Sequence, residues 1–118
     1  MQRPFRLRRH VDFDRVRAQG QQWRHPLVTM TIAPNELSYN RYGFVASRRL
    51  GSAVVRNRTR RVLREVLRRA NPRLRAGYDI VFIARNALLE QPYNRVDQAL
   101  GELFRRANLW LMAEEEAE

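Results

Sequence analysis

The chain has 118 residues, the size of one ordinary domain, and 44% of them are apolar, which is enough to build a single modest core. It has no cysteine and only two histidines, His10 and His25, which excludes disulfides, thiolate catalysis and metal sites built on cysteine. The formal net charge is +11, and all 23 basic residues are arginine, the side chain whose planar fork matches phosphate.

The first part of the chain predicts one helix and two strands. Residues 11–19 form a short amphipathic helix, capped by Asp12 and ended by Gly20. Residues 27–33 alternate between apolar and polar side chains, which predicts a strand buried on one face only. A second strand follows at 42–47 after a turn at 34–36, and we expect the two strands to form a hairpin.

The second part predicts two helices around a buried strand. Ser52 is the expected N-cap of the longest helix, 53–70, and Pro72 lies just past its end. Residues 78–84 are nearly all apolar, which is typical of a strand covered on both faces. Apolar residues at helical spacing predict a last helix over 94–112.

These elements predict one α+β domain over residues 1–113, in the order α-β-β-α-β-α. It would contain a small sheet of about four strands packed with three helices. The remaining residues, 114–118, are mostly acidic, and we expect them to be a disordered tail. No internal repeat or linker divides the chain.

The positive charge is concentrated in one segment. Between Arg41 and Arg75 there are 12 arginines and a single acid, Glu65, whereas the rest of the chain has 11 arginines and 11 acids. On the wheel of helix 53–70 the apolar residues fall on one arc and the arginines on the other. A solvated surface stripe is the alternative explanation, but nearly uncompensated repulsion along the helix favours a polyanionic partner.

One string of residues is more specific than the composition. The segment from Gly43 to Glu65, GFVASRRLGSAVVRNRTRRVLRE, closely resembles the signature of the bacterial ribonuclease P protein subunit. The resemblance extends upstream to Asp12-Phe13 and Gly20, and downstream to residues 79–85 and 103–106.

The resemblance implies a non-catalytic protein subunit of an endoribonuclease. In that family a large RNA, using Mg²⁺, hydrolyses precursor tRNA and removes its 5′ leader. The protein binds this catalytic RNA with its arginine-rich helix and holds the leader in a cleft between the sheet and the first helix. The resemblance also implies a left-handed strand-helix-strand crossover, against the usual rule.

Two sets of site residues follow, and no catalytic or metal-binding residue is expected. The expected contacts to the catalytic RNA are Arg48, Arg49, Arg56, Asn57, Arg58, Arg60, Arg61, Arg64 and Arg68. The expected leader cleft contains Phe13, Arg17, Met30 and Phe44. Core packing is the alternative for the two phenylalanines, and a place in the first helical turn is the alternative for Asn57. Many family members have aromatic residues where this chain has Arg17 and Met30, so its cleft would depend more on charge and less on stacking.

Two other classes of function remain as alternatives. A structural RNA-binding protein, such as a small ribosomal protein, has similar size and charge but not the 23-residue string. An independent nuclease needs clustered carboxylates or paired histidines, and the acids outside the tail are scattered. We expect the catalytic RNA and precursor tRNA as partners, with Mg²⁺ held mainly by the RNA, no obligate protein partner and no membrane. No apolar run is long enough to span a bilayer and no secretory signal is evident, which favours the cytoplasm.

Overall fold

The computed structural model describes residues 5–112, so the acidic tail predicted at 114–118 lies outside the described residues. Within that range, helices and strands follow in the order α-β-β-β-α-β-α, with short 3₁₀ turns between some of them. Helices α1, α2 and α3 span His10–Gln19, Ala53–Ala70 and Tyr93–Arg106. Strands β1, β2, β3 and β4 span Gln21–Arg24, Val28–Pro34, Arg41–Val45 and Tyr78–Ala84. The α+β class is confirmed, with one strand more than the predicted order.

The four strands form one mixed sheet in the spatial order β1-β2-β4-β3. The hairpin predicted between strands 27–33 and 42–47, which correspond to β2 and β3, is therefore wrong. Strand β2 pairs antiparallel with one side of β4, and β3 pairs parallel with the other side. The physical reason is the composition of β4, which is almost wholly apolar and becomes buried only in the centre of the sheet. The actual hairpin joins β2 to β1, a polar edge strand that the hydrophobic pattern did not reveal.

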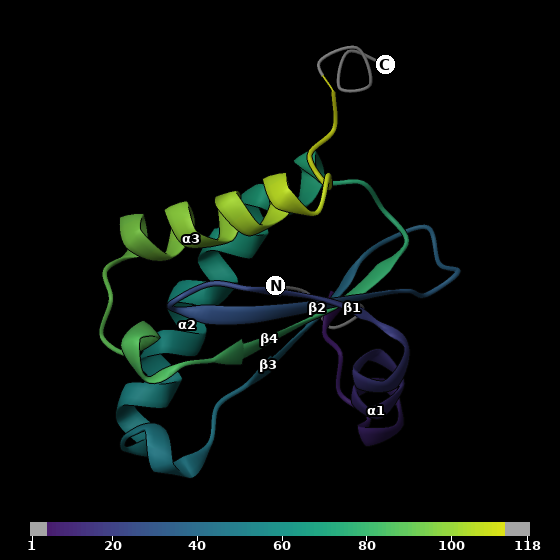
Figure 1. The fold of residues 1–118 in the computed structure, drawn as a ribbon. Helices are drawn as coiled ribbons and strands as arrows, with labels where there is room; N and C mark the ends of the chain where they lie inside the picture. Colours follow the sequence, from purple (N-terminus) through teal and green to yellow (C-terminus); the bar gives the residue numbers. More distant parts are fainter. Residues whose placement is uncertain (1–4, 113–118) are drawn as a thin grey trace.

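The helices cover both faces of this sheet. Figure 1 shows the sheet nearly edge-on, with α1 on one side and α3 on the other. The main core lies between the sheet and α2 and α3, and its largest fully buried side chains include Phe82, Phe104, Met30 and Leu63. A smaller core, made by Leu7, Val16, Ala33 and Val81, lies beneath α1. Strand β2 is consequently buried on both faces, not on one as its alternating pattern predicted.

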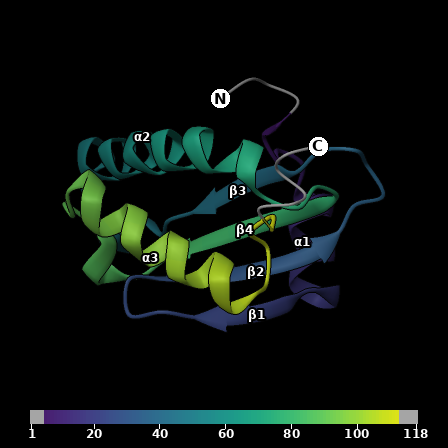
Figure 2. The same ribbon diagram turned by 90° about the horizontal axis from the view of Figure 1, so that it is seen from above.

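Helix α2 connects the parallel strands β3 and β4. Ser52 caps it as predicted, because the side-chain oxygen accepts a hydrogen bond from the amide of Val55 at 3.2 Å. Its buried residues, Thr59, Leu63, Val66, Leu67 and Ala70, all belong to the predicted apolar arc, and the two other members of that arc, Val55 and Val62, are half-buried. With α2 and α3 on the near side of the sheet in Figure 2, the step from β3 through α2 to β4 is left-handed, as the family resemblance implied.

The two other helices differ from prediction at their ends. Helix α1 starts two residues before Asp12, whose carboxylate lies in the first turn and does not cap the helix. Gly20 follows the helix as predicted, but because the chain is crowded there: a Cβ would lie 2.5 Å from the carbonyl oxygen of Val16. Helix α3 ends at Arg106, since Asn108 adopts a left-handed conformation (φ 57°) and Trp110 forms a β-bridge with Leu74.

Candidate nucleic-acid interface

The side of α2 away from the core carries the arginines. Asn57, Arg58, Arg61, Arg68 and Arg69 are exposed, whereas Arg56, Arg60 and Arg64 are half-buried. Within residues 5–112, Arg58, Arg61 and Arg69 form no ion pair or side-chain hydrogen bond. The surface of α2 is thus a nearly uncompensated cationic face. We use the name arginine face for Arg56, Asn57, Arg58, Arg60, Arg61, Arg64 and Arg68, and Arg69 lies beyond them at the end of the helix.

One acid lies on the arginine face. Glu65 accepts two hydrogen bonds from Arg68, one from the side-chain nitrogen Nε at 3.1 Å and one from Nη2 at 2.7 Å. This pair, three residues apart, lowers the pKa of Glu65, mainly through the hydrogen bond from Arg68. Arg68 is thereby partly neutralised, so its charge is less available to a partner than that of Arg61.

Other contacts on the arginine face orient individual side chains. The guanidinium of Arg60 lies 5.4 Å from the ring centroid of Phe44 and donates to the side-chain oxygen of Asn57 at 3.0 Å. The guanidinium of Arg56 donates to the carbonyl oxygen of Gly51 at 2.5 Å. Asn57 is exposed and orients Arg60, so it has a defined contact within the protein besides any that it makes to RNA.

Residues of β3 line part of two hollows on the surface. The first, here called the α1 hollow, has a volume of about 410 Å³ and lies between α1 and the sheet. It is lined by Phe13, Val16, Arg17, Gly20, Gln22, Thr31, Val45, Val81 and Ile83. Apolar side chains form its floor, and Arg17 supplies a cation at its margin. A partly apolar hollow with a cation at its margin suits single-stranded nucleic acid, whose bases stack and whose phosphates need countercharge.

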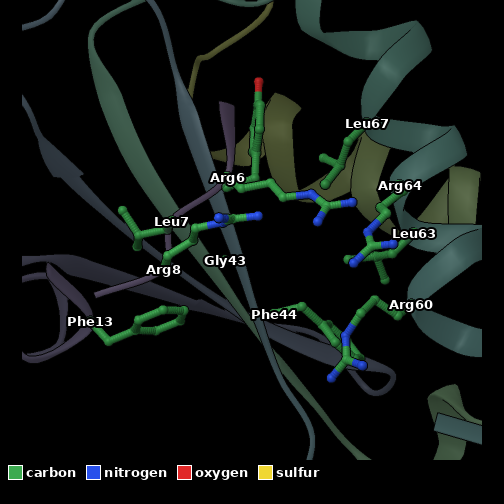
Figure 3. Close-up of a pocket in the computed structure, with 11 residues that line it drawn as sticks. Arg6, Leu7, Arg8, Phe13, Gly43, Phe44, Arg60, Leu63, Arg64 and Leu67 are labelled. Atoms are coloured by element: carbon green, nitrogen blue, oxygen red, sulfur yellow. The ribbon is translucent and has the colours of Figure 1, made fainter. Parts of the chain in front are cut away.

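The second, here called the β3-edge hollow, has a volume of about 210 Å³ and opens beside β3 (Figure 3). Arg6, Leu7 and Arg8 of the N-terminal segment form one wall, and Arg60, Leu63, Arg64 and Leu67 of α2 form the other. Phe13, Tyr42, Gly43 and Phe44 complete the lining. The amide of Leu7 donates to the carbonyl oxygen of Tyr42 at 2.8 Å, which fixes the N-terminal segment along the edge of β3.

Gly43 lets the two hollows adjoin. A Cβ at this position would lie 2.6 Å from the ring of Phe13, so only glycine allows that ring to approach β3 so closely. Phe13 lines both hollows as a result. The ring lies on the α1 side of β3, and Figure 3 shows it across the strand from Phe44 and Arg60.

The structure brings together only part of the predicted leader cleft. Phe13 and Arg17 share the α1 hollow. Met30 is fully buried in the main core on the opposite face of β2, so its assignment to the cleft is wrong. Phe44 also faces the main core side and packs against Arg60, so it lines the β3-edge hollow, not the α1 hollow. Of Arg48 the structure describes only the backbone, which begins a 3₁₀ turn that also contains the exposed Arg49.

Only some of the residues that the sequence analysis missed have a signal in the sequence. Thr31 occupies the β2 position that faces the α1 hollow, and the alternation of β2 already separated it from Met30. Arg6 and Arg8 line the β3-edge hollow, but a segment before the first helix gave no pattern that would place them there. Arg41 belongs to the basic segment in the sequence, but its guanidinium is paired with the buried carboxylate of Asp79.

An independent nuclease would need clustered acids or paired histidines, and the structure shows where these side chains lie. Among residues 5–112, no three acidic or histidine side chains lie close enough together to hold a metal ion. The side-chain Nδ1 of His25 accepts a hydrogen bond from the amide of Leu27 at 3.0 Å, and its Nε2 lies 3.5 Å from a carboxylate oxygen of Glu102. His10 starts α1 and is exposed. None of the helices in the described part of the chain is both long and apolar enough to cross a membrane.

This fold and its cationic face define a small RNA-binding protein of α+β type. The sequence profile of the family described as Ribonuclease P matches residues 1–108. The ribonuclease P protein component of Herpetosiphon aurantiacus is 40% identical over 110 residues, covering 93% of this chain and 89% of the relative. That of Chloroflexus aurantiacus is 44% identical and covers 92% of this chain and 82% of the relative.

Solved structures agree with the sequence comparison. The ribonuclease P protein of Thermotoga maritima has a TM-score of 0.79 and 30% identity, over 86% of this chain and 96% of its own. That of Staphylococcus aureus has a TM-score of 0.83 over 91% of this chain and 98% of its own, and at 24% identity it supports the fold alone. The chain belongs to the ribonuclease P protein component family. It therefore has a role in ribonuclease P, a tRNA-processing endoribonuclease, in association with the RNA subunit.

Proposed function

We propose that this protein binds the catalytic RNA of ribonuclease P through the arginine face and holds the 5′ leader of precursor tRNA in the α1 hollow. The observation that carries the proposal is the link between the two surfaces through the β3-edge hollow. Arg60 and Arg64 of the arginine face line that hollow, and Phe13 lines both it and the α1 hollow, where Arg17 supplies a cation. One RNA would bind the helix while a second, single-stranded one lies across the sheet.

The arginine face suits a folded RNA because its cations project from one rigid helix. Charges on a helix have fixed spacings, so they can match the phosphates of a structured RNA without losing entropy on ordering a loop. Arg61 and Arg58 are exposed and make no competing contact within the described residues, which makes them the best candidates for direct phosphate contacts. Arg49, in the turn before α2, extends the same cationic surface.

The α1 hollow suits an extended strand with little sequence preference. A base stacked on Phe13 would gain about 1–3 kcal/mol, and every base has a face on which to stack. Arg17 would contact a phosphate, and the hydroxyl of Thr31 could donate or accept a hydrogen bond at a base edge or ribose. Because Phe13 is the only aromatic residue among the described residues that line this hollow, charge contributes more to leader binding here than stacking does.

In this proposal the chemistry belongs to the RNA. Mg²⁺ would be held mainly by the RNA, and when bound there it would activate a water and stabilise the leaving oxygen. The protein positions the precursor and offsets the repulsion between two polyanions. Contacts with the leader increase the affinity for the precursor relative to the product, because mature tRNA has no leader to fill the hollow.

The test is a cleavage assay on precursor tRNA at low Mg²⁺ with the catalytic RNA, the protein or both. We expect cleavage at the mature 5′ end only when the RNA is present, and faster cleavage with the protein added. Phe13→Ala should weaken binding of precursor tRNA but leave mature tRNA unaffected, whereas Arg61→Ala should weaken assembly with the catalytic RNA. Correct cleavage by the protein alone, after micrococcal nuclease has removed contaminating RNA, would refute the proposal.

A further inference from the structure

Three guanidinium groups converge on the β3-edge hollow. Figure 3 shows the side chain of Arg6 extending toward α2, where Arg64 points back toward it and Arg60 lies below. The pKa of Arg64 is lowered, first by its partial burial and then by the charges of Arg6 and Arg60. None of the described residues that line the hollow is acidic. Within residues 5–112, the hollow therefore holds like charges close together without a carboxylate in its lining to offset them.

Arg6 also has an unsatisfied donor. Its side-chain Nε is buried and has no hydrogen-bond partner within the described part of the chain. Leaving a buried donor unpaired costs about 1–3 kcal/mol, and native proteins nearly always satisfy such groups. An acceptor that enters the hollow would remove this cost together with the repulsion among the arginines.

The hollow has the shape and walls of an anion site. Its volume of about 210 Å³ is several times the roughly 30 Å³ that one water occupies in the liquid, so a group larger than water fits. Leu63 and Leu67 form part of the wall, and an apolar wall strengthens the attraction between a guanidinium and an anion. Arg60 is already held by Phe44 and Asn57, so it needs little reordering to bind.

We propose that the β3-edge hollow binds a single phosphate group between Arg6 of the N-terminal segment and Arg60 and Arg64 of α2. Guanidinium forks donate pairs of hydrogen bonds to phosphate oxygens, and three forks from different directions match a tetrahedral group better than a planar carboxylate. The bound phosphate joins the N-terminal segment to α2 across the edge of β3. That the phosphate is part of an RNA rests on the proposed function, whereas the site itself does not.

The site is tested first with inorganic phosphate. The Nε–Hε signals of the arginines in isotopically labelled protein are followed by NMR as phosphate replaces chloride at constant ionic strength. We expect saturable shifts for Arg6, Arg60 and Arg64, and none for Arg69, which is exposed on the same helix outside the hollow. Shifts that grow linearly and alike for all arginines would overturn the proposal, because they indicate screening only.

Matched variants then locate the site. Arg6→Gln and Arg64→Gln should weaken phosphate binding by about tenfold or more, as expected for the loss of a charge-assisted contact. Arg69→Gln removes the same charge from the surface and should leave the affinity unchanged. Amide spectra of each variant show whether it is folded. Equal weakening by all three variants would mean a diffuse charge effect and would contradict the assignment.

The source of the phosphate is distinguished with short single-stranded RNAs that differ only at the 5′ end. If the 5′-phosphorylated RNA alone displaces inorganic phosphate from Arg6 and Arg64, the hollow takes a terminal phosphate. If the 5′-hydroxyl RNA competes equally, it takes a phosphate of the backbone. If neither RNA competes with inorganic phosphate, the proposal that the bound phosphate belongs to an RNA is refuted. The cleavage assay with the unmodified protein is a separate readout, so a failed phosphate site and a failed proposed function are distinguishable.

Discussion

The guanidinium of Arg41 donates two hydrogen bonds to the carboxylate of Asp79, from Nε to Oδ1 at 2.8 Å and from Nη2 to Oδ2 at 2.7 Å. The two residues are register partners on the parallel strands β3 and β4. Asp79 is fully buried and also accepts hydrogen bonds from Arg15 of α1 and Asn35 of the loop after β2. The hydrogen bond to Asp79 raises the pKa of Arg41. One carboxylate thus connects α1 to the sheet beside the α1 hollow.

Asp79→Asn should lower the free energy of unfolding by about 2–3 kcal/mol. The loss is smaller than the roughly 3–5 kcal/mol of a fully buried pair, because the side chains of Arg41 and Arg15 are 23% and 28% exposed and can reach water. Urea unfolding gives the value. Asp97→Asn, at an exposed position of α3, removes the same charge and should change stability by less than about 0.5 kcal/mol. Equal effects of the two substitutions would show that net charge, not the network, is responsible.

Tyr42 should make the protein sensitive to alkaline pH. Burial raises the pKa of its phenol from 10.0 to about 12. Because the folded-state pKa lies above the unfolded one, this contribution to stability is complete below pH 10 and is lost as the pH rises to 12. The loss should be on the order of 2 kcal/mol. Unfolding of Tyr42→Phe, measured over the same range, should depend less on pH. Parallel pH profiles of the two proteins would contradict this prediction.

Affinity for the catalytic RNA should depend strongly on salt. If five to eight arginines of the segment from Arg48 to Arg69 each neutralise a phosphate, log K should fall against log salt with a slope of roughly −4 to −7. Filter binding or fluorescence titration over a series of salt concentrations measures the slope. A slope shallower than about −2 would mean that most of the arginine face remains solvated in the complex.

The arginines of α2 should not be equivalent. Arg61→Ala and Arg64→Ala should each weaken assembly with the catalytic RNA by about 1–3 kcal/mol, in the range for a lost charge-assisted contact. Arg69→Ala should weaken it much less, because it lies near the end of α2, away from both hollows. Thermal stability should stay level or rise slightly, since repulsion along the helix decreases. If all three substitutions weaken assembly equally, the helix acts as a diffuse cloud of charge.

The sequence predicted the elements that bury a continuous apolar pattern. Helix α2 and strand β4 have the predicted bounds, because their apolar residues follow one pattern from end to end. Strand β1 was missed because Trp23 is its only apolar residue, and pairing with β2 supplies the rest of its stability. Strand order depends on contacts between distant residues, such as Arg41 with Asp79, which no local pattern contains.

For the candidate site too, the sequence predicted what lies within one element and not what distant elements form together. The arginine face could be read from a helical wheel, since one element contains all of its residues. The α1 hollow, our proposed leader cleft, combines α1 with residues of all four strands, so the place of Met30 depended on which face of β2 meets α1. The β3-edge hollow depends on the docking of residues that precede any regular element, through the bridge between Arg6 and Tyr42.

The position of β4 in the middle of the sheet also determines when the chain can fold during synthesis. Strands β2 and β3 are made early, but neither has its main partner until residues 78–84 have left the ribosome. The arginine-rich helix α2 is completed before that strand, so its apolar side has no finished sheet to cover it while its cationic side is already present. A nascent chain of this protein therefore passes through a stage at which the cationic side of α2 is present but the sheet is not yet complete. Truncation between Ala70 and Tyr78 should leave it at that stage.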